Sequence, residues 1–389
     1  MRAAVVHDYF TQLGGAEIVA QELVRMLPAA DLYSTVALPE CLPVGLKNVA
    51  VKTSWMQRLP RMRDLYRLYF LLYPLGVGSL DLSQYDLVIS SSSGYAKGVR
   101  TGRDTVHICY CHTPMRWAWS FDSYSARESM GSFQRAIVPH FIRMLREWDT
   151  GASRQPDHFV ANSQTVAARI QRAYGRTAEV IHPPIDLNRF KPSAEQEDYY
   201  LVLSRLVSYK RIDLAVQACT DLKRRLIVIG DGPDRARLAA LAGPTVTFLG
   251  RLPNAEVEHY ASRCRALLFP GEEDFGMAPL EIAAAGRPTI AYRAGGAVET
   301  IVEDSTGVFF NTQTPSDLGA AIQRFESMNW RADTLATHAS KFGIDVFQNS
   351  FWRFLSRVGC PVTEQEGALA VAQAGSSMQV ALRRQELPA

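Results

Sequence analysis

The chain has 389 residues, which is more than one hydrophobic core usually serves, so we expect two domains of ordinary size. Its hydrophobic fraction of 47% and charged fraction of 21% are those of globular proteins and exclude a fibrous or largely disordered chain. The 42 basic and 39 acidic residues leave a formal net charge of +3, which is too balanced for a general nucleic-acid binder.

Cysteine usage and hydropathy indicate a cytoplasmic protein. The six cysteines form no CxxC pair, so neither disulfides nor a zinc site are expected. His7 and Asp8 interrupt the first apolar run too early for a secretory signal peptide. No apolar stretch reaches the roughly 18 residues of a membrane span, and the nearest, 68–80, contains Pro74.

Short apolar runs alternate with amphipathic segments, which predicts parallel sheets with helices on both faces. The predicted strands are Ala3–Val6, Leu87–Ser90, Val106–Tyr110, Phe159–Ala161, Tyr200–Leu203, Leu226–Ile229, Val246–Leu249, Ala266–Phe269 and Thr289–Ala291. A segment rich in proline and charge, 180–192, separates the two series. We therefore expect one domain over 1–190 and a second over 191–342, with the functional site in the cleft between them.

The C-terminal region combines a predicted helix with a polar tail. Phe347, Phe351, Phe354 and Leu355 have helical spacing, which predicts an amphipathic helix over about 343–358. Residues 361–389 are rich in Ala, Gln, Gly and Ser, and we expect them to be mobile.

Two motifs of the first half have both a functional and a structural interpretation. Gly14 and Gly15 follow the first strand and open a helix, as glycines do where backbone approaches a phosphate or sugar, although a plain tight turn explains them as well. His112 ends a predicted strand and would face the cleft, or it fills a purely structural role.

The segment 55–74 mixes basic and aromatic residues. Arg58, Arg61, Arg63 and Arg67 lie among Trp55, Tyr66, Tyr69, Phe70 and Tyr73. This mixture is typical of a segment that lies on an anionic membrane surface. A packed helix with snorkelling arginines is the alternative.

The most informative stretch is 269–288. A strand is predicted to end at Phe269 and a helix to begin near Gly276, with Pro279 tolerated in its first turn. The backbone N–H groups of Gly276, Met277 and Ala278 would then face a phosphate, supported by the helix dipole.

Glu273 and Glu281 flank this helix start. On one continuous helix they would lie about 80° apart. With Glu273 in the preceding loop, one carboxylate reaches a sugar and the other a ribose, as a nucleotide sugar requires. Alternatively, Glu272, Glu273 and Asp274 are only acids favoured at a helix entry.

This E-x7-E pattern, with FG before PLE and AxGRP after it, resembles the donor-site signature of family 4 glycosyltransferases of the GT-B type. The resemblance implies an α/β fold of two Rossmann-like, doubly wound parallel-sheet domains facing a central cleft, with the last helix packing back on the first domain. It also implies a retaining transfer without metal or other cofactor. Glu273 would then bind sugar hydroxyls, Glu281 the ribose, and Arg205 and Lys210 the pyrophosphate, in place of a divalent ion.

The family's pattern assigns further residues. It makes His112, Glu273, Arg205 and Lys210 catalytic, with His112 stabilising an oxocarbenium-like transition state. The implied substrate-binding residues, besides those at the helix start, are Gly14, Gly15, Arg116, Gly230, Leu252 and Phe275. Taken alone, Arg205 and Lys210 could equally be a solvated surface pair, and the Gly230 turn an ordinary one.

Within the family, the segments 85–98 and 110–119 resemble WbaZ-like mannosyltransferases of bacterial lipopolysaccharide and exopolysaccharide assembly. That implies GDP-mannose as donor, a polyprenyl-diphosphate-linked saccharide as acceptor, and peripheral attachment to the anionic inner face of the plasma membrane. The open alternatives are a UDP- or ADP-sugar donor, a soluble acceptor, and a sugar-nucleotide-binding scaffold without activity. An epimerase or a glycogen-type phosphorylase shares the fold but fits these motifs less well.

Overall fold

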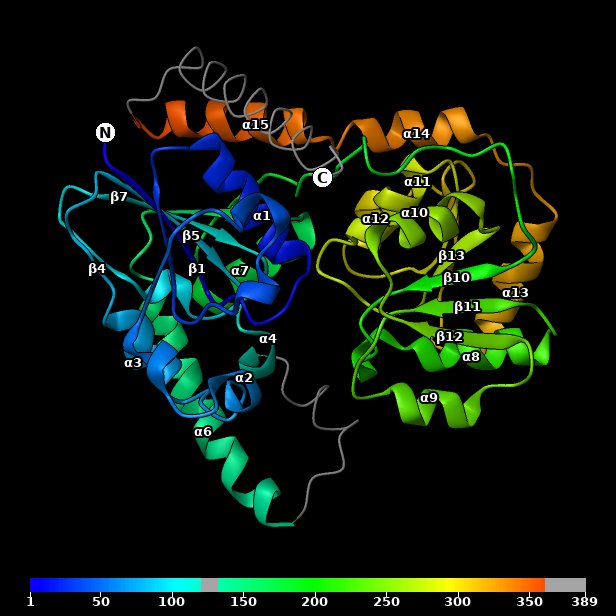
Figure 1. The fold of residues 1–389 in the computed structure, drawn as a ribbon, viewed down its shortest axis with the longest axis horizontal. Coiled ribbons are helices and arrows are strands. Elements are labelled where there is room, and N and C mark those ends of the chain that lie inside the picture. Colours follow the sequence, from blue (N-terminus) through cyan, green and yellow to red (C-terminus); the bar gives the residue numbers. More distant parts are fainter. Residues whose placement is uncertain (120–131, 361–389) are drawn as a thin grey trace, which may run out of the picture. The chain divides into compact units, whose positions relative to one another are not determined.

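The computed structural model describes residues 1–119 and 132–360 (Figure 1). The chain divides into two compact units. Of the described residues, the first contains those of Met1–Asn162, Val166–Pro184 and 347–360, and the second contains Ser163–Thr165 and Ile185–Val346. The chain passes from the first unit to the second between Pro184 and Ile185, within the proline-rich segment 180–192 and six residues before the expected boundary at 190/191. The tail expected to be mobile lies outside the described residues.

The first unit is built on a seven-stranded parallel sheet in the order β3-β2-β1-β5-β7-β8-β9. Its strands are β1 (Ala3–His7), β2 (Asp31–Ser34), β3 (Val51–Thr53), β5 (Leu87–Ser92), β7 (Val106–Cys111), β8 (His158–Ala161) and β9 (Glu179–Val180), with β4 (Asp81–Leu82) and β6 (Arg100–Thr101) forming a separate pair. The sequence analysis identified β1, β5, β7 and β8. It missed β2, β3 and β9, which are short and, in β3 and β9, not fully buried, so that no apolar run marks them.

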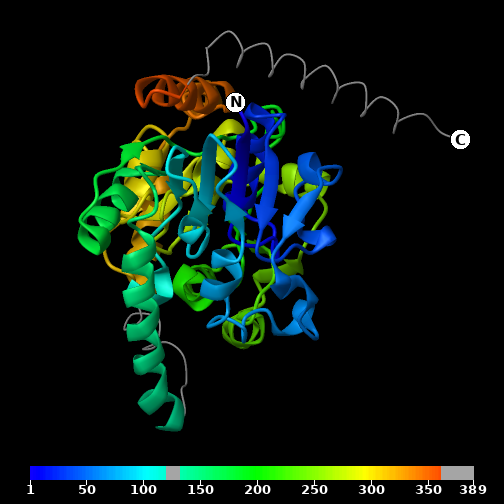
Figure 2. The same ribbon diagram turned by 90° about the vertical axis from the view of Figure 1, so that its left-hand side faces the viewer.

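Helices cover both faces of this sheet. The helical segments are α1 (Gly15–Met26), η1 (Pro39–Cys41), η2 (Val44–Leu46), η3 (Trp55–Arg58), α2 (Met62–Leu65), α3 (Tyr73–Gly78), η4 (Ala96–Gly98), α4 (Arg116–Trp119), α6 (Ser132–Ala152), α7 (Gln164–Tyr174) and α15 (Ile344–Arg357). Helices α1 and α15 pack on one face, where Leu23 and Phe351 join Val5, Ile89 and Tyr110. The opposite face carries α3, α6 and α7, and Figure 2 shows α6 extending well beyond the sheet.

The second unit has a six-stranded parallel sheet in the order β12-β11-β10-β13-β14-β15. Its strands are β10 (Tyr200–Leu203), β11 (Leu226–Ile229), β12 (Val246–Gly250), β13 (Ala266–Phe269), β14 (Thr289–Tyr292) and β15 (Gly307–Phe310). Helices α8 (Ile212–Asp221), α9 (Arg235–Leu241) and α13 (Pro315–Glu326) cover one face, and α10 (Asn254–Arg263), α11 (Met277–Ala284), α12 (Ala297–Thr300) and α14 (Ala332–Ser340) cover the other (Figure 1). All predicted strands of this half are present.

Both units are doubly wound, which confirms the predicted fold class. The strand order reverses once in each sheet, between β1 and β5 in the first and between β10 and β13 in the second. In open parallel sheets, ligands bind beside the carboxyl ends of the strands at this reversal. The loops after these four strands are therefore where functional side chains are expected.

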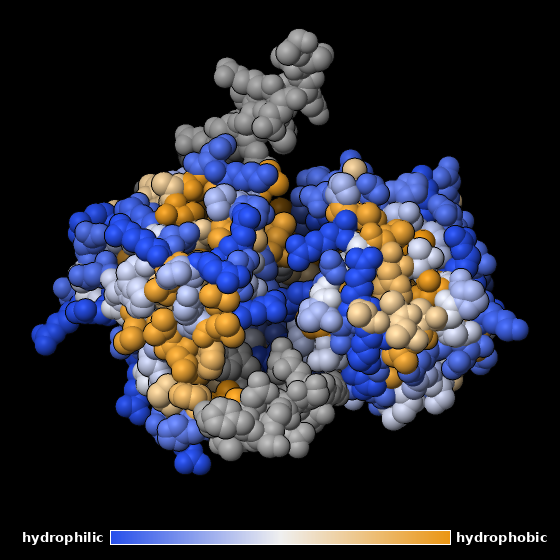
Figure 3. Space-filling view, turned by 60° about the horizontal axis from the view of Figure 1, so that its bottom comes forward, coloured by the Kyte–Doolittle hydropathy of each residue, from blue (hydrophilic) through white to orange (hydrophobic). Residues whose placement is uncertain are grey.

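The segment 55–74 is not the single helix of the alternative interpretation. It consists of η3, α2 and irregular turns before α3, and Arg61 interrupts it with a left-handed φ of 48°. Met56, Met62 and Tyr73 are buried, so Tyr73 does not reach the surface as expected for a membrane contact. Trp55 and Leu68 are 42% and 70% exposed, and Figure 3 shows hydrophobic surface on this unit. Within the described residues, no helix is long and apolar enough to span a membrane.

Candidate functional site

Two loops of the second unit meet at its strand reversal. The turn after β10 carries Arg205 and ends in the short helix η5 (Ser208–Lys210), and the loop after β13 carries Glu273. Lys210 Nζ forms a salt bridge with Glu273 Oε1, and these side chains are only 18% and 15% exposed. The structure thus brings together the predicted cation and carboxylate, whereas the Arg205 side chain is exposed.

Gly271 allows this close approach. A Cβ atom at this position would lie 2.8 Å from Lys210 Cα, closer than real Cβ contacts. The loop is also held by its backbone: Gly296 N–H donates to Glu273 O at 2.9 Å, and Gln313 Nε2 donates to Pro270 O at 2.9 Å. The position of Glu273 is therefore set mainly by hydrogen bonds that the main-chain carbonyls of its loop accept.

Helix α11 begins directly after this loop, at Met277, one residue beyond the predicted start. Gly276 is its N-cap, with a φ of 93° that favours glycine. Pro279 lies in the first turn, as predicted, and the N-cap has no side chain to accept from the first N–H groups. The N–H groups of Met277 and Ala278 are thus placed where an anion can bind.

Glu281 and Phe275 lie on either side of this helix start. Glu281 is half-buried, and burial raises the pKa of its carboxyl, with Arg189 opposing and Asp186 adding to the effect. The Phe275 side chain is 3% exposed and packs in a small cluster with Leu280 and Phe342. Any ligand contact of Phe275 would therefore come from its backbone.

Gly230 and Leu252 follow the two neighbouring strands. Gly230 comes directly after β11, and its N–H donates to Gly250 O at 2.8 Å. Leu252 follows β12 and is partly buried against the second core cluster of this unit. The loops that carry them follow β11 and β12, which lie next to β10 in the sheet, so they lie on the same side as the Arg205 turn.

In the first unit, the predicted residues follow β1 and β7. Gly14 is the N-cap of α1 and Gly15 its first residue, as predicted. His112 directly follows β7 and is 7% exposed; its Nε2 lies 2.8 Å from Ser91 Oγ, and its carbonyl accepts from Asn162 Nδ2 at 3.0 Å. Arg116 opens α4 and is half-buried.

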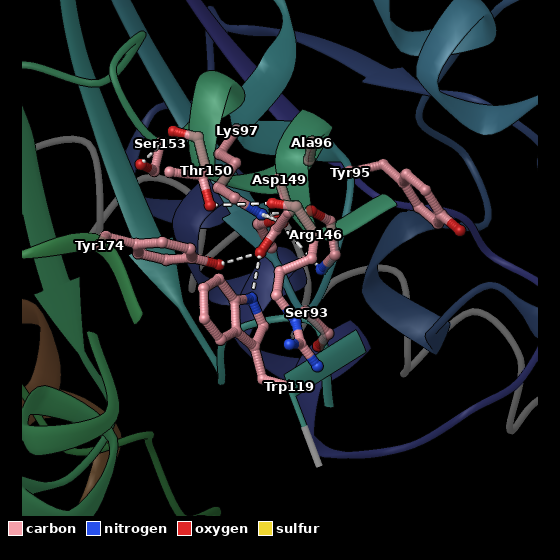
Figure 4. Close-up of polar contacts among 12 residues, drawn as sticks. Ser93, Tyr95, Ala96, Lys97, Trp119, Arg146, Asp149, Thr150, Ser153 and Tyr174 are labelled. Carbon is pink, nitrogen blue, oxygen red and sulfur yellow. Dashed lines mark hydrogen bonds and ion pairs between the residues drawn. The ribbon is translucent and has the colours of Figure 1, made fainter. Parts of the chain in front are cut away.

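A buried ion pair supports α4 (Figure 4). Asp149, on α6, forms a salt bridge with Lys97 of η4, and their side chains are 0% and 1% exposed. Asp149 also accepts from Trp119 Nε1 and from Tyr174 OH, each at 2.7 Å. Burial lowers the pKa of the Lys97 ammonium, but Asp149 outweighs this effect, so the pKa lies above its ordinary value.

Helix α6 holds α4 at a second point as well. The Arg146 guanidinium donates to Ala118 O at 2.7 Å, and its charge lies 5.3 Å from the Trp119 ring centroid. Together these contacts fix the segment that carries Arg116. The sequence analysis quoted Lys97 within a longer motif but assigned it no role, because its partner Asp149 lies 52 residues away.

The described residues contain no group of three or more His, Cys, Asp or Glu side chains arranged to hold a metal ion.

Two family models match the chain. Residues 13–189 match the model described as Glycosyltransferase Family 4, and residues 185–342 match Glycosyl transferases group 1. A GDP-mannose-dependent alpha-(1-6)-phosphatidylinositol monomannoside mannosyltransferase of Mycobacterium tuberculosis is 28% identical over 229 residues, which cover 46% of this chain. The match spans only 60% of that relative's length.

Solved structures of this fold cover nearly the whole chain. Sucrose-phosphate synthase from Thermosynechococcus elongatus has a TM-score of 0.69 at 16% identity, and Anabaena HepE in complex with UDP and glucose has one of 0.67 at 17% identity. Each covers 92% of this chain and 100% of the other. At this identity, the likeness shows the fold alone.

The two family models together cover residues 13–342, and the fold agrees with them. The chain belongs to the family 4 glycosyltransferases of the GT-B type.

Proposed function

We propose that this protein is a retaining glycosyltransferase that moves mannose from GDP-mannose to a saccharide acceptor without a metal ion. The observation that carries the proposal is the Lys210–Glu273 pair at the strand reversal. The pair lies directly before the start of α11, whose N-cap makes no side-chain hydrogen bond. The family match supports the reaction class, and the mycobacterial relative supports the donor. The finer WbaZ-like assignment stays part of the proposal.

The geometry suggests how a nucleotide sugar would bind. The salt bridge neutralises both partners, so a donor must give each a substitute: its phosphate oxygens accept from Lys210, and a sugar hydroxyl donates to Glu273. The exchange conserves a hydrogen bond at each side chain, while the backbone holds both loops in place. Arg205, which lies in the same turn five residues before Lys210, adds a second positive charge for the departing diphosphate.

Glu281 would accept hydrogen bonds from the ribose, and the N–H groups at the start of α11 would hold the pyrophosphate. Retention would follow from attack on the same face that the diphosphate leaves, with a phosphate oxygen taking the acceptor's proton. His112 and Arg116 would act on the sugar and acceptor from the first unit. No carboxylate is assigned as a nucleophile.

We propose a lipid-linked acceptor, a polyprenyl-diphosphate saccharide, met at an anionic membrane surface. The exposed Trp55 and Leu68 beside Arg58, Arg61 and Arg63 support this. Two of these three arginines already contact acids, Arg61 with Asp64 at 3.6 Å and Arg63 with Glu40, so the net attraction is smaller than three free cations would give.

Vesicle sedimentation tests the membrane role. Replacing Arg58, Arg61 and Arg63 by glutamate should weaken binding to vesicles with anionic lipid at low salt, because the surface charge reverses. The matched control replaces three exposed arginines on other surfaces, Arg225, Arg331 and Arg353, by glutamate. If the wild type does not sediment, or both triple variants sediment equally, the membrane role is wrong.

The donor is tested by thermal shift and turnover together. A ligand that binds only the native state raises its melting temperature, so GDP and GDP-mannose should stabilise the protein more than UDP, ADP and their sugars. A larger melting-temperature shift with UDP-glucose would show that the donor is UDP-glucose and not GDP-mannose. Binding of GDP-mannose without transfer to any lipid-linked or soluble acceptor would favour the scaffold alternative.

A further inference from the structure

A row of buried polar side chains leads from α1 to His112 across the strand reversal of the first unit. His7 ends β1, Ser91 lies on β5 directly opposite it in the sheet register, and His112 follows β7. His7 Nδ1 lies 3.0 Å from Ser91 Oγ, and Ser91 Oγ lies 2.8 Å from His112 Nε2. The chain of contacts therefore crosses three adjacent strands at their carboxyl ends.

Glu17 of α1 closes the row. Its Oε1 lies 3.8 Å from His7 Nε2, an electrostatic contact longer than a hydrogen bond. The residue is 2% exposed, and its Oε2 has no hydrogen-bond partner in the described part of the chain. Because a buried carboxylate with so few donors is costly, it favours a proton on the nitrogen of His7 that faces it.

Counting donors and acceptors along the row then shows which atom carries each proton. If His7 carries its proton on Nε2, its Nδ1 accepts from the Ser91 hydroxyl. The Ser91 oxygen is left to accept, so the His112 nitrogen that faces it must donate. His112 is thereby held as the tautomer with hydrogen on Nε2 and with Nδ1 as an acceptor.

We propose that Glu17, His7 and Ser91 are positioning residues that fix the tautomer and ring orientation of His112. This inference rests on the proposed function, in which His112 acts on the transferred sugar. None of the three needs to touch a substrate. The His7 ring is itself held by Phe10, with ring centroids 4.7 Å apart, so the row is fixed by packing as well as by hydrogen bonds.

The chain contains a matched control for Ser91. Ser90, its neighbour on β5, is equally buried and also bonds to a histidine, since its Oγ lies 2.9 Å from His107 Nε2. It faces the opposite side of the sheet and has no part in the row to His112. Ser90→Ala and Ser91→Ala therefore remove the same kind of bond from the same strand.

The first measurement is a long-range ¹H–¹⁵N spectrum of the full chain with labelled histidine, in which His112→Gln identifies the His112 signals. We expect the wild type to show His112 protonated on Nε2. Ser91→Ala and Glu17→Gln should shift these signals or mix the tautomers, and Ser90→Ala should leave them unchanged. Signals of a proton on Nδ1 in the wild type, or no change in either variant, would overturn the proposal.

The second measurement is turnover. Ser91→Ala should lower kcat at least tenfold relative to Ser90→Ala, while the melting-temperature shift caused by the donor nucleotide stays equal in both variants. Equal kcat values would overturn the inference. If the wild type transfers no sugar at all, the proposed function fails, and the spectrum still decides whether Glu17 and Ser91 set the state of His112.

Discussion

The two units hold their candidate functional groups in different ways. In the first unit, His112 and the α4 segment rest on side chains buried among other polar side chains, namely Ser91 with His7 and Asp149 with Lys97. In the second unit, Lys210 and Glu273 are partly exposed at loop ends and are placed by backbone contacts.

The difference predicts how each unit responds to mutation. Removing one member of a buried polar network leaves its partners without hydrogen bonds or charge balance, so stability falls together with function. Removing a charge at a loop that the backbone holds costs little stability, so the effect appears in ligand binding or turnover. Four predictions test this contrast.

The largest effect is expected from Asp149→Ala. Breaking a buried ion pair by removing one partner costs about 3–5 kcal/mol, because the Lys97 charge stays buried alone. Urea unfolding followed by the fluorescence of Trp119 and Trp148 in the first unit should show the loss. The exposed pair of Arg331 and Asp333 provides the control, and Asp333→Ala should leave the unfolding midpoint nearly unchanged. Similar unfolding midpoints for Asp149→Ala and Asp333→Ala would contradict the proposed contrast between buried and exposed charges.

The next effect concerns acid stability of the first unit. Burial lowers the pKa of His107 from 6.5 to about 4. Between these two values the unfolded state binds a proton that the folded state does not, so stability is lost as the pH falls from 6.5 toward 4, by roughly 3 kcal/mol in total. Unfolding of His107→Gln should therefore depend less on pH over this range. The exposed His259→Gln should keep the wild-type slope, and equal slopes in all three proteins would refute the assignment.

In the second unit, Glu273→Ala and Arg205→Ala should each lower kcat by about 10² or more, the scale of one lost preorganised electrostatic contact. Their melting temperatures should stay close to that of the wild type, since backbone contacts hold the loops. Glu272→Ala changes the exposed neighbouring acid and should retain near-normal turnover. Near-normal kcat in both of the first two variants would show that the donor-site assignment is wrong.

The smallest effect is expected from metal removal. Turnover should survive EDTA, because Arg205, Lys210 and the N-terminus of α11 are proposed to balance the charge of the leaving diphosphate. Loss of turnover that magnesium or manganese restores would sink this proposal.

The sequence predicted the second unit better than the first. Strands β10, β11 and β13 are continuous apolar runs that begin and end at the predicted residues, because both of their faces are buried, although the buried β15 was missed. The start of α11 was predicted to within one residue, since Gly276 and Pro279 are local signals that need no tertiary partner. In the first unit, β2 and β3 lack such a run.

Sequence reasoning missed the positioning residues for the same kind of reason. Glu17 lies two residues after the pair of Gly14 and Gly15, yet only the glycines were assigned a role. His7 appeared only as a break in an apolar run, and Ser91 lay within the segment 85–98 without a role of its own. The one available signal was polar residues at the ends of buried strands, which is weak without the strand order.

By itself, the sequence determined most of the long buried strands, the doubly wound class and the helix start at the donor-site motif, because propensity, hydrophobic periodicity and glycine conformation act over a few residues. Only the tertiary structure decided which distant side chains share a buried environment. Lys97 forms its ion pair with Asp149, 52 residues away in the sequence, and His7 bonds to Ser91, 84 residues away. A buried charge or imidazole must be satisfied by whatever the strand order brings beside it, and that order is a property of the whole fold.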